Sequence, residues 1–460
     1  MGDELYRLLP QVDEVLRTPA AAVLTASFGR SAVHRALREE LHQLRLRIAA
    51  GQMQAGDIRR ALEGLTDSLQ LRLEHRTKQN LRRVVNGTGV LLHTNLGRAP
   101  LAPSAIQAIE DAARGFSTLE YNLERKERGS RQDHVRDWLT QLTGAEDAFV
   151  VNNNAGAVLL VLAALTKGRE VIVSRGELVE VGGSFRIPEI IEQGGARLKE
   201  VGSTNKTHLG DYERAITSET AALLKVHTSN YRVIGFTAAV ETAALVKLAQ
   251  SRGLLAICDL GSGVLVPDFG EPTVREAVEQ SLDVVTFSGD KLMGGPQAGV
   301  IVGKRQHIDV IKRHPLARAL RIDKLTLAAL EATLRLYHCS ETAGEVPLLR
   351  MFRRTCAELQ LEAESLAVAI NNIDALRATV VSASGQMGGG AMPEQEIPSV
   401  AVAISSDGFS SVQLEEGLRK APVPVIARLV QDEVWIDMRT LLPGDAGDIT
   451  AALTAIAGNI

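Results

Sequence analysis

Apolar positions recur with two different periods along the chain. In the first 83 residues they recur three or four positions apart, which is the spacing of one face of an α-helix. Between residues 31 and 50 this stripe consists of Val33, Leu37, Leu41, Leu44 and Ile48. From about Asp57 a second stripe consists of Ile58, Leu62, Leu65, Leu69 and Leu73. The pattern predicts a helical domain over residues 1–83.

From about Val84 the pattern changes to short apolar runs, rich in β-branched residues, that are separated by stretches of helical length. These runs predict strands at residues 148–151, 171–174, 223–226, 254–258, 284–287 and 300–302. Strands that alternate with helices are joined by crossovers. We therefore predict an α/β domain over residues 84–337, with a mainly parallel central sheet that is buried on both faces.

The remaining residues, 338–460, predict a small α+β domain. A helix is expected over residues 348–370, followed by a loose glycine-rich stretch over 385–391. Shorter strands are expected near 399–404, 423–429 and 434–438, followed by a final helix.

The charge of the chain is distributed unevenly. Over 460 residues, 51 Lys and Arg stand against 55 Asp and Glu, a formal charge of −4, which argues against a uniformly basic nucleic-acid-binding protein. Residues 1–83 nevertheless hold 14 basic and 10 acidic residues, a charge of +4, which leaves −8 on the rest. Of these 14 basic residues 13 are Arg, the side chain best suited to bidentate phosphate contacts.

Other features exclude several classes of protein. The 3 cysteines lack the spacing of a zinc site or a disulfide framework. No apolar stretch is long enough to span a bilayer, and the N-terminus lacks the pattern of a signal peptide, so a cytoplasmic protein is expected. The sequence motifs of P-loop enzymes, zinc proteases and serine hydrolases are absent.

Polar residues directly follow three of the predicted strands. The run LLAIC ends at Asp259, and DVVTF is followed by residues 288–291, which end in Lys291. The run AFVV is followed by residues 152–156, which open a predicted helix. Ligands of parallel sheets bind at the carboxyl ends of the strands, so we expect these polar groups to meet in one crevice.

This set of residues suits pyridoxal phosphate. Its aldehyde binds covalently to a lysine amine, its ring nitrogen needs a carboxylate to stay protonated, and its phosphate binds a hydroxyl and the N–H groups of a helix N-terminus. We assign the amine to Lys291 and the carboxylate to Asp259. The phosphate is assigned to Asn153, Asn154, Ala155, Gly156 and Ser288. Each residue alone is weak evidence, because such residues more often lie in turns or on the surface, but their joint order favours the cofactor site.

Seven stretches of the chain carry a more specific signal. They read NGTGVLLHTNLGRAPL, VNNNAGAVLL, VSRGELVEVGGSFRIPEI, VHTSNYRVIGFT, CDLGSG, FSGDKLMGGPQAGVIVGK and HPLARALRIDKLTLAALEATLRLY. Together they closely resemble bacterial selenocysteine synthase, the family of L-seryl-tRNA(Sec) selenium transferases. The lysine stretch alone would indicate only a pyridoxal-phosphate enzyme of the aspartate aminotransferase fold type.

The resemblance implies a fold, a reaction and an assembly. The fold is that of fold-type I pyridoxal-phosphate transferases, with an extra helical N-terminal domain. The reaction converts L-seryl-tRNA(Sec) to L-selenocysteinyl-tRNA(Sec): Lys291 takes the α-proton, β-elimination gives dehydroalanyl-tRNA, and selenium from selenophosphate adds to it. The assembly is a ring of dimers, a decamer, with active sites at the dimer interfaces.

The resemblance also implies the residues that bind the selenium donor, which is an anion. Motif by motif these are Arg98, Arg131, Arg318 and Arg321, and guanidinium groups suit oxyanions. Asp290 is implied as a further active-site residue beside the lysine. Ser229 and Asn230 are implied to contact the 3-oxygen of the cofactor, whereas His227 fits either the site or the core.

In this family the N-terminal domain binds the tRNA by its shape. The resemblance therefore implies that the arginine-rich helices of residues 1–83 contact the tRNA. The arginines on their predicted outer faces are Arg35, Arg38, Arg45, Arg72 and Arg76. A low aromatic content, 3% of the chain, agrees with binding through the tRNA backbone rather than by base stacking.

Two alternatives remain open. The first is a pyridoxal-phosphate lyase or β-replacement enzyme that acts on a small free substrate. The second is a tRNA-binding protein without catalytic activity. The helical domain discriminates the first from the main interpretation, and a cofactor bound to Lys291 discriminates the second.

Overall fold

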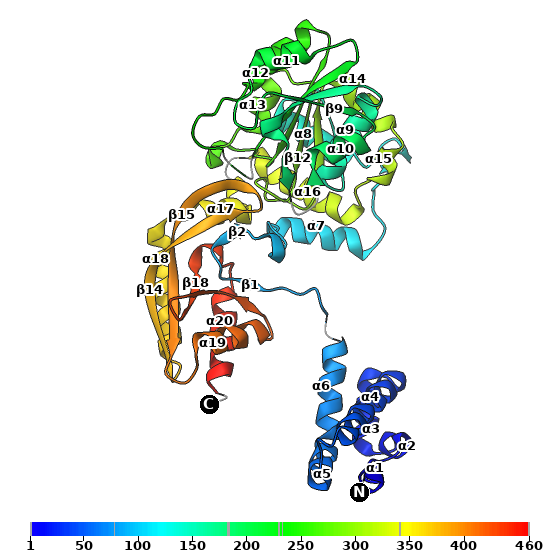
Figure 1. Cartoon of the computed structure of the whole chain (residues 1–460), viewed down its shortest axis with the longest axis vertical. Coiled ribbons are helices and arrows are strands. Elements are labelled where there is room, and N and C mark those ends of the chain that lie inside the picture. The colour runs from blue at the N-terminus through cyan, green and yellow to red at the C-terminus, as the bar shows by residue number, and fades with distance from the viewer. Residues whose placement is uncertain are drawn as a thin grey trace. The chain divides into compact units, whose positions relative to one another are not determined.

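The computed structural model divides into two compact units, Met1–Arg83 and Val84–Ile460, whose elements are labelled in Figure 1. The structure describes all residues except Met1, Lys78, residues 182–184, Ser229, Asn230, Arg232, Ser340, Glu341, Asn459 and Ile460.

The first unit is helical, as predicted. Its helices are α1 (Gly2–Tyr6), α2 (Val12–Leu16), α3 (Pro19–Phe28), α4 (Arg30–Ala49), α5 (Ala55–Glu63) and α6 (Leu65–Thr77). The apolar stripe predicted between residues 31 and 50 is buried along α4 and packs on Leu65, Leu69 and Leu73 of α6. This shared core holds the unit together by apolar burial.

The single helix predicted from Asp57 is in fact two helices, α5 and α6, separated at Gly64. The N–H of Gly64 donates to the carbonyl oxygen of Arg60 at 3.1 Å and ends α5. Glycine is a poor helix former, which explains why the apolar period continues through this point while the helix does not.

The arginines of this unit fall into two groups. Arg35, Arg38 and Arg45 are exposed on α4, and no ion pair joins them to another residue in the described part of the chain. Arg72 instead lies with its Nη2 2.5 Å from Oε2 of Glu40. Arg76 pairs with Glu39. The second group therefore has its charge partly balanced by α4.

In the described residues of the second unit, seven strands form the central sheet. In spatial order they are β5 (Asp147–Val151), β13 (Gly299–Gly303), β12 (Val284–Ser288), β11 (Leu255–Gly261), β10 (Thr220–Val226), β6 (Glu170–Ser174) and β9 (Arg197–Val201). The strands from β12 to β9 are parallel, and β13 runs antiparallel to both of its neighbours. The predicted α/β fold with a mainly parallel sheet is confirmed.

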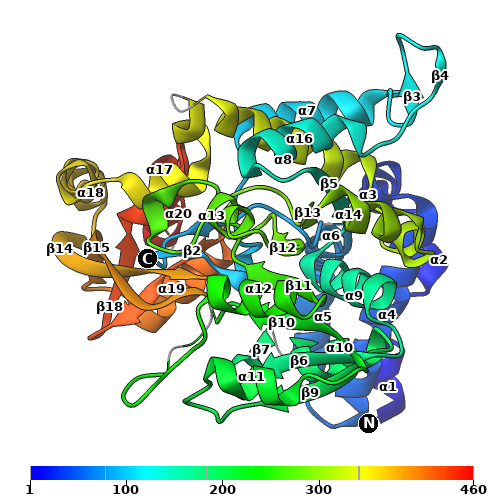
Figure 2. The same ribbon diagram turned by 90° about the horizontal axis from the view of Figure 1, so that it is seen from above.

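Helices cover both faces of this sheet (Figure 2). One core joins the sheet to α8 (Asp133–Thr143), α12 (Thr242–Ser251), α13 (Val274–Glu279) and α16 (Lys324–His338). The other joins it to α9 (Asn154–Leu165), α10 (Ile187–Gln193) and α14 (Arg305–Arg313). Along β5, Ala148 and Val150 enter the first core, and Phe149 and Val151 enter the second. The alternation follows from the period of two along a strand and explains the continuous apolar runs.

The rest of the second unit contains a five-stranded sheet. In spatial order its strands are β17 (Arg428–Val430), β18 (Glu433–Asp437), β15 (Ala391–Ser406), β14 (Leu376–Gly388) and β2 (Val90–Leu92). A separate core joins it to α18 (Cys356–Asn371), α19 (Ser411–Lys420) and α20 (Asp445–Ala457). The division of this unit into domains at residue 337 stays a prediction.

Two predictions for this region were wrong. The helix expected over residues 348–370 is interrupted between α17 (Pro347–Arg353) and α18, because Thr355 caps α18 and exchanges hydrogen bonds with Glu358. The stretch expected to be loose, residues 385–391, is the end of the β14–β15 hairpin and pairs with β2. Gly388, Gly389 and Gly390 all have positive φ angles, so the glycines form its tight turn.

The remaining elements connect these layers. They are α7 (Pro103–Arg114), α11 (Leu209–Ala215), α15 (Leu316–Ala319), β1 (Val85–Asn86), β16 (Val425–Ile426), β3 (Tyr121–Asn122), β4 (Glu127–Arg128), β7 (Glu180–Val181) and β8 (Phe185–Arg186). Among the described helices none combines the length and the apolar character needed to cross a membrane.

Candidate active site

Lys291 lies just beyond the carboxyl end of β12 and is buried, with 6% of its surface exposed. The turn that places it requires Gly289, because a Cβ there would lie 2.5 Å from the carbonyl oxygen of Pro296. Burial lowers the pKa of the Lys291 amine, the charge of Asp259 opposes this shift, and the charge of Arg98 adds to it. The site therefore favours a neutral amine more than water does, and such an amine is a nucleophile and a base.

Asp259 lies on β11, next to β12 in the sheet, and is buried. Its Oδ1 accepts hydrogen bonds from Nδ2 of Asn154 at 2.9 Å and from Oγ1 of Thr286 at 3.0 Å. Burial raises the pKa of Asp259 above its usual value, and these two hydrogen bonds together with the charge of Lys291 offset the rise only in part. The carboxylate is thus held in place from two other elements and faces the lysine.

Asn153 and Asn154, in the turn before α9, have different hydrogen-bond partners. Oδ1 of Asn153 accepts the N–H of Gly156 at 2.8 Å, so Asn153 is the N-cap of the helix. Asn154 reaches Asp259 instead. The first N–H groups of a helix have no partner within it, and those of Asn154 and Ala155 remain at this N-terminus. Their predicted contact with a phosphate stays a prediction, as does that of Ser288, a buried residue at the end of β12.

Two buried polar atoms beside Lys291 and Asp259 have no well-aligned hydrogen bond to a protein atom among the described residues. They are Oδ1 of Asn154 and Oγ of Ser262, although the Ser262 hydroxyl also faces the carboxylate of Glu271. The carbonyl oxygen of Ser262 accepts the N–H of Leu292, which places this residue directly beside the lysine. Buried polar groups normally have partners, so these atoms are suited to a polar ligand. The amine, the carboxylate, the helix N-terminus and the unpaired atoms together fit pyridoxal phosphate.

Arg98 brings a positive charge to the lysine from another part of the chain. Its Nη1 lies 2.6 Å from Oδ2 of Asp290, the residue before Lys291. Arg98 has a φ of 63° in the turn after β2, which is uncommon for a residue with a side chain. The structure thus brings together Arg98 and Asp290, which are 192 positions apart.

Arg131 and Arg321 both lie at Glu120. Arg131 is buried and donates to Oε1 of Glu120 from Nε at 2.9 Å and from Nη2 at 2.7 Å. It also donates from Nη1 to the carbonyl oxygen of Ile322. Nη1 of Arg321 lies 3.6 Å from the same carboxylate oxygen. Arg131 therefore supports the segment that carries Arg321, and its predicted contact with an anion stays a prediction.

The other predicted site residues are exposed, half-buried or outside the described residues. Arg318 is exposed on α15 and Arg321 is exposed two residues beyond that helix. Ser229 and Asn230 lie outside the described residues. His227 is half-buried, and its backbone N–H donates to the carbonyl oxygen of Asp259 at 2.9 Å.

Three residues of this site were missed in the sequence. Thr286 precedes Ser288 by two positions on the same strand, so strand alternation would have placed it on the same face. Ser262 directly follows β11, the strand of Asp259, and was recognisable as a polar residue at a strand end. Glu271 lies with Oε2 3.5 Å from Nε2 of His227 and carried no signal in the sequence.

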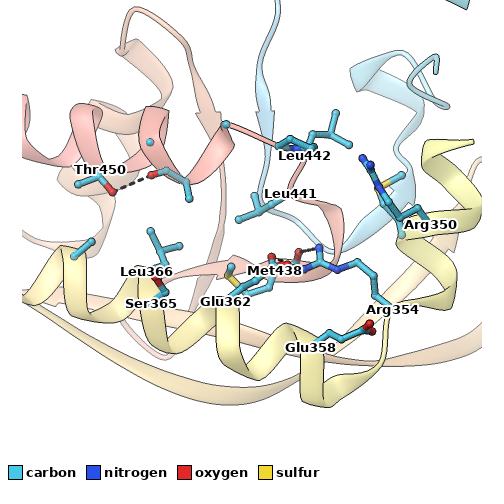
Figure 3. Close-up of a pocket in the computed structure, with 16 residues that line it drawn as sticks. Arg350, Arg354, Glu358, Glu362, Ser365, Leu366, Met438, Leu441, Leu442 and Thr450 are labelled. Carbon is cyan, nitrogen blue, oxygen red and sulfur yellow. Dashed lines mark hydrogen bonds and ion pairs between the residues drawn. The ribbon is translucent and has the colours of Figure 1, made fainter. Parts of the chain in front are cut away.

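A hollow lies apart from the candidate site residues, between α17, α18 and the start of α20 (Figure 3). It has a volume of about 740 Å³, and Arg350, Arg354 and Glu362 line it beside apolar side chains such as Leu366 and Leu441. None of the predicted site residues lines it. In the described part of the chain no cluster of His, Cys, Asp and Glu is suited to a metal ion.

A solved structure shares the fold. A D-glucosaminate-6-phosphate ammonia-lyase aligns with 84% of this chain and 98% of its own, with a TM-score of 0.58 and 26% identity. The aspartate aminotransferase of Thermus thermophilus aligns with 86% of this chain and 95% of its own, with a TM-score of 0.42 and 16% identity.

Sequence comparisons are more specific. The family model of L-seryl-tRNA selenium transferase matches residues 84–442, and the model of the selenocysteine synthase N-terminal region matches residues 6–45. The L-seryl-tRNA(Sec) selenium transferase of Geobacter sulfurreducens is 48% identical, over 98% of this chain and 99% of its own length. That of Caldanaerobacter subterraneus subsp. tengcongensis is 47% identical, over 99% of both. The resemblance seen in the motifs is confirmed, and the chain belongs to the family of L-seryl-tRNA(Sec) selenium transferases.

Proposed function

We propose that the protein converts L-seryl-tRNA(Sec) to L-selenocysteinyl-tRNA(Sec), with selenophosphate as the selenium donor. The observation that carries the proposal is a buried lysine facing a buried aspartate at adjacent strand ends, in a chain that matches the family over residues 84–442. The reaction is a β-elimination from the seryl group followed by addition of selenium.

The cofactor is pyridoxal phosphate, which when bound withdraws electrons from the α-carbon of the amino acid. Lys291 holds its aldehyde and then removes the α-proton, because a desolvated amine is a stronger nucleophile and base at neutral pH. Asp259 keeps the ring nitrogen protonated. The turn of residues 153–156 and Ser288 bind the phosphate, and Ser229 and Asn230 contact the 3-oxygen.

The selenium donor, the selenophosphate anion, binds at the arginines of the site. Arg98 is held by Asp290 next to Lys291, which supports a role for both residues at the reacting group. Arg318 and Arg321 are exposed and have guanidinium groups suited to an oxyanion. Arg131 acts with them by holding Glu120 and the Arg321 segment.

The helical unit of residues 1–83 binds the tRNA, residues 84–337 form the cofactor domain, and residues 338–460 form the small domain. Binding of the tRNA is supported by the match of residues 6–45 to the N-terminal family model and by the exposed arginines of α4. The protein works in the cytoplasm as a ring of dimers, a decamer, with active sites at the dimer interfaces.

Changing Arg35, Arg38 and Arg45 together to alanine is expected to weaken tRNA binding and to flatten its salt dependence. Each lost phosphate contact lowers the slope of log affinity against log salt by somewhat less than one, so the slope should fall by about two to three. Titrations of labelled tRNA(Sec) at several salt concentrations measure both quantities.

A matched control removes three positive charges from the second unit, at Arg377, Arg419 and Lys420, which are exposed. This variant should keep the slope of the wild-type protein. An unaltered slope in the α4 variant would mean that this face does not contact the tRNA. Arg72 and Arg76, which are partly balanced by Glu39 and Glu40, should contribute less than the α4 arginines.

The test of the proposed function supplies purified protein, loaded with pyridoxal phosphate, with seryl-tRNA(Sec) and selenophosphate. The expected product is selenocysteinyl-tRNA(Sec), detected by mass spectrometry of the released amino acid. Reactions without selenophosphate and with seryl-tRNA(Ser) are the controls. Absence of the product from a cofactor-loaded protein would reject the proposal.

A second function deserves a test because of the ammonia-lyase likeness, at 26% identity and a TM-score of 0.58. In this alternative the protein is a pyridoxal-phosphate lyase or β-replacement enzyme with a small free substrate. The family match over residues 6–45 favours the tRNA substrate instead.

Deleting residues 1–80 discriminates the two functions, since the residues from Val84 onward form their own compact unit. If the substrate is seryl-tRNA, turnover should fall by about 100-fold or more at limiting substrate, because the phosphate contacts that hold the tRNA are lost. The absorbance of the bound cofactor should persist and serves as the folding control. Full turnover of a small substrate by the shortened protein would favour the alternative.

A further inference from the structure

A small hollow opens at the edge of the central sheet that also carries Lys291. It has a volume of about 340 Å³ and is lined by the ends of β6 and β10, by residues 204–207 after β9, and by the loop after β10. His227 joins the hollow to the active site: it lines the hollow, and its backbone N–H donates to the carbonyl oxygen of Asp259 at 2.9 Å. His227 therefore connects the hollow to Asp259 of the cofactor site.

The polar groups in the floor of this hollow bind one another. Glu177 is buried, and its Oε1 accepts from Nζ of Lys225 at 2.6 Å while its Oε2 accepts from the N–H of Val226 at 3.0 Å. The hydroxyls of Ser174 and Thr207 lie 2.7 Å apart. The carboxylate is thus neutralised by a lysine and by hydrogen bonds, so the floor does not repel an anion.

The rim of the hollow, here the loop between Val233 and Thr237 that line it, presents apolar side chains to solvent. Ile234 is 80% exposed and Phe236 is 87% exposed. Gly235 between them has a φ of 112°, a conformation that favours glycine, and it makes the loop turn sharply at this tip. Exposed apolar side chains gathered in this way at a ligand-binding edge indicate a binding surface.

The loop is fastened, so Phe236 is held at this rim. Nδ2 of Asn205 donates to the carbonyl oxygen of Phe236 at 2.6 Å, and the N–H of Ala238 donates to the carbonyl oxygen of Asn205 at 3.0 Å. Thr207 adds a third hydrogen bond to this loop, since its N–H donates to the carbonyl oxygen of Ala238 at 2.9 Å. A loop backbone that is held before binding loses less conformational freedom when a ligand binds.

Lys206 adds a positive charge to this rim. Its Nζ lies 5.5 Å from the centroid of the Phe236 ring. The side chain is exposed, and no ion pair joins it to another residue within the described part of the chain. The ammonium group therefore lies over one face of the ring. An aromatic ring with a cation beside it is a combination that binds single-stranded nucleic acid, because a base can stack on the ring and a phosphate can meet the cation.

We propose that this rim binds the 3′-terminal nucleotide of the aminoacylated tRNA, with its base on Phe236 and a phosphate at Lys206. The inference rests on the proposed function. The seryl group is esterified to the ribose of that nucleotide, so the ribose lies within a few bonds of the α-carbon that Lys291 must reach. The hollow lies at the same carboxyl edge of the sheet as Lys291, and His227 connects it to Asp259. Because stacking tolerates any base, the contact places the end of the tRNA without selecting its identity.

The test compares Phe236→Ala with Phe236→Tyr in the full-length, cofactor-loaded protein. With Phe236→Ala the KM for seryl-tRNA(Sec) should rise about tenfold, the effect expected when one stacked base loses its ring. The kcat should change little, and Phe236→Tyr should behave as the wild type. Lys206→Ala should raise KM by a smaller factor and flatten its salt dependence. The control is Leu361→Ala, a residue of α18 that is 69% exposed.

A spectroscopic measurement reports the stacking directly. In tRNA(Sec) that carries 2-aminopurine in place of the terminal adenine, the fluorescence should be quenched by the wild type and by Phe236→Tyr, but much less by Phe236→Ala. If Phe236→Ala does not fold, as judged from the cofactor absorbance, the tyrosine and Lys206 variants and the wild-type quenching still provide the test.

Three results would refute either the proposed subsite or the proposed function, and each can be told from the others. If the wild type makes selenocysteinyl-tRNA while Phe236→Ala keeps its KM and its quenching, the subsite is refuted and the proposed function stands. If Phe236→Ala changes the mass of the assembly in solution and leaves KM unaltered, the loop is a contact between copies of this chain, and the subsite is refuted. If the cofactor-loaded wild type makes no product, the proposed function itself fails.

Discussion

Replacing Lys291 by alanine is expected to abolish formation of selenocysteinyl-tRNA, with a fall in rate of at least about 10⁴-fold. The change removes both the amine that holds the cofactor aldehyde and the base that takes the α-proton. Among the described residues, Lys225 near the end of β10 cannot replace it, because its amine is bound to Glu177. The measurement is the single-turnover rate, together with the yellow absorbance of lysine-bound pyridoxal phosphate, which should vanish.

Two variants control this experiment. Lys291→Arg keeps the positive charge but not a nucleophilic amine, and should be equally inactive if the chemistry rather than the charge matters. Lys304→Ala removes a lysine from the opposite, amino-terminal edge of β12, where it binds Asp283 at 2.7 Å, and should retain the absorbance band. A wild-type protein that shows no such band after loading would refute the assignment of Lys291 and leave a tRNA-binding protein without catalysis as the alternative.

The strands that the sequence predicted in the central sheet are buried on both faces. In β5, neighbouring residues enter two different cores, so residues 148–151 are all apolar and the run stands out. The strand β9 was missed because it lies at the sheet edge and reads RLKEV, with charged side chains that reach solvent. The strand β14 and the start of β15 were missed altogether, and the glycines that indicate a loop form the tight turn between them.

The centre of the site was predictable for a topological reason. Parallel strands end at one edge of the sheet, so residues that follow separate strands, such as Lys291, Asp259 and Asn154, meet there. The ion pairs around this centre were not predictable, because they depend on contacts between loops that are far apart in the chain. Nothing in the sequence indicated that Glu120 would hold both Arg131 and Arg321, or that Glu271 would face His227. Such pairs are fixed by packing of the whole chain.

The same reasoning separates the two groups of arginines in the first unit. Helical periodicity places Arg35 and Arg72 equally well on outer faces, and both were predicted to contact tRNA. The packing of α6 on α4 then turns Arg72 toward Glu40 and leaves Arg35 exposed. Periodicity determines which side of a helix is apolar, whereas the neighbours of its polar side depend on how the helices pack.

Replacing Asp259 by asparagine is expected to keep the fold and lower the rate of elimination by about 100-fold or more, the effect of removing a charge that stabilises a transition state. Asparagine has nearly the same shape, and its Oδ1 can still accept from Asn154 and Thr286. What is lost is the negative charge that keeps the cofactor ring nitrogen protonated. The single-turnover rate at saturating pyridoxal phosphate measures the effect, and near-normal turnover would contradict the role of Asp259.

The matched control is Asp283→Asn, another buried aspartate that precedes β12 at the other edge of the sheet. Although burial alone would raise it, the pKa of Asp283 is lowered to about 2 by hydrogen bonds from His307, Ala256 and Lys304. A lowered pKa stabilises the fold above the unfolded value of about 3.9, and this stability is lost as pH falls toward 2. Asp283→Asn should therefore lower the Tm at neutral pH and leave the elimination rate of the folded protein unchanged. Asp259→Asn should do the opposite, and this reversal separates a carboxylate that acts on the cofactor from one that stabilises the sheet.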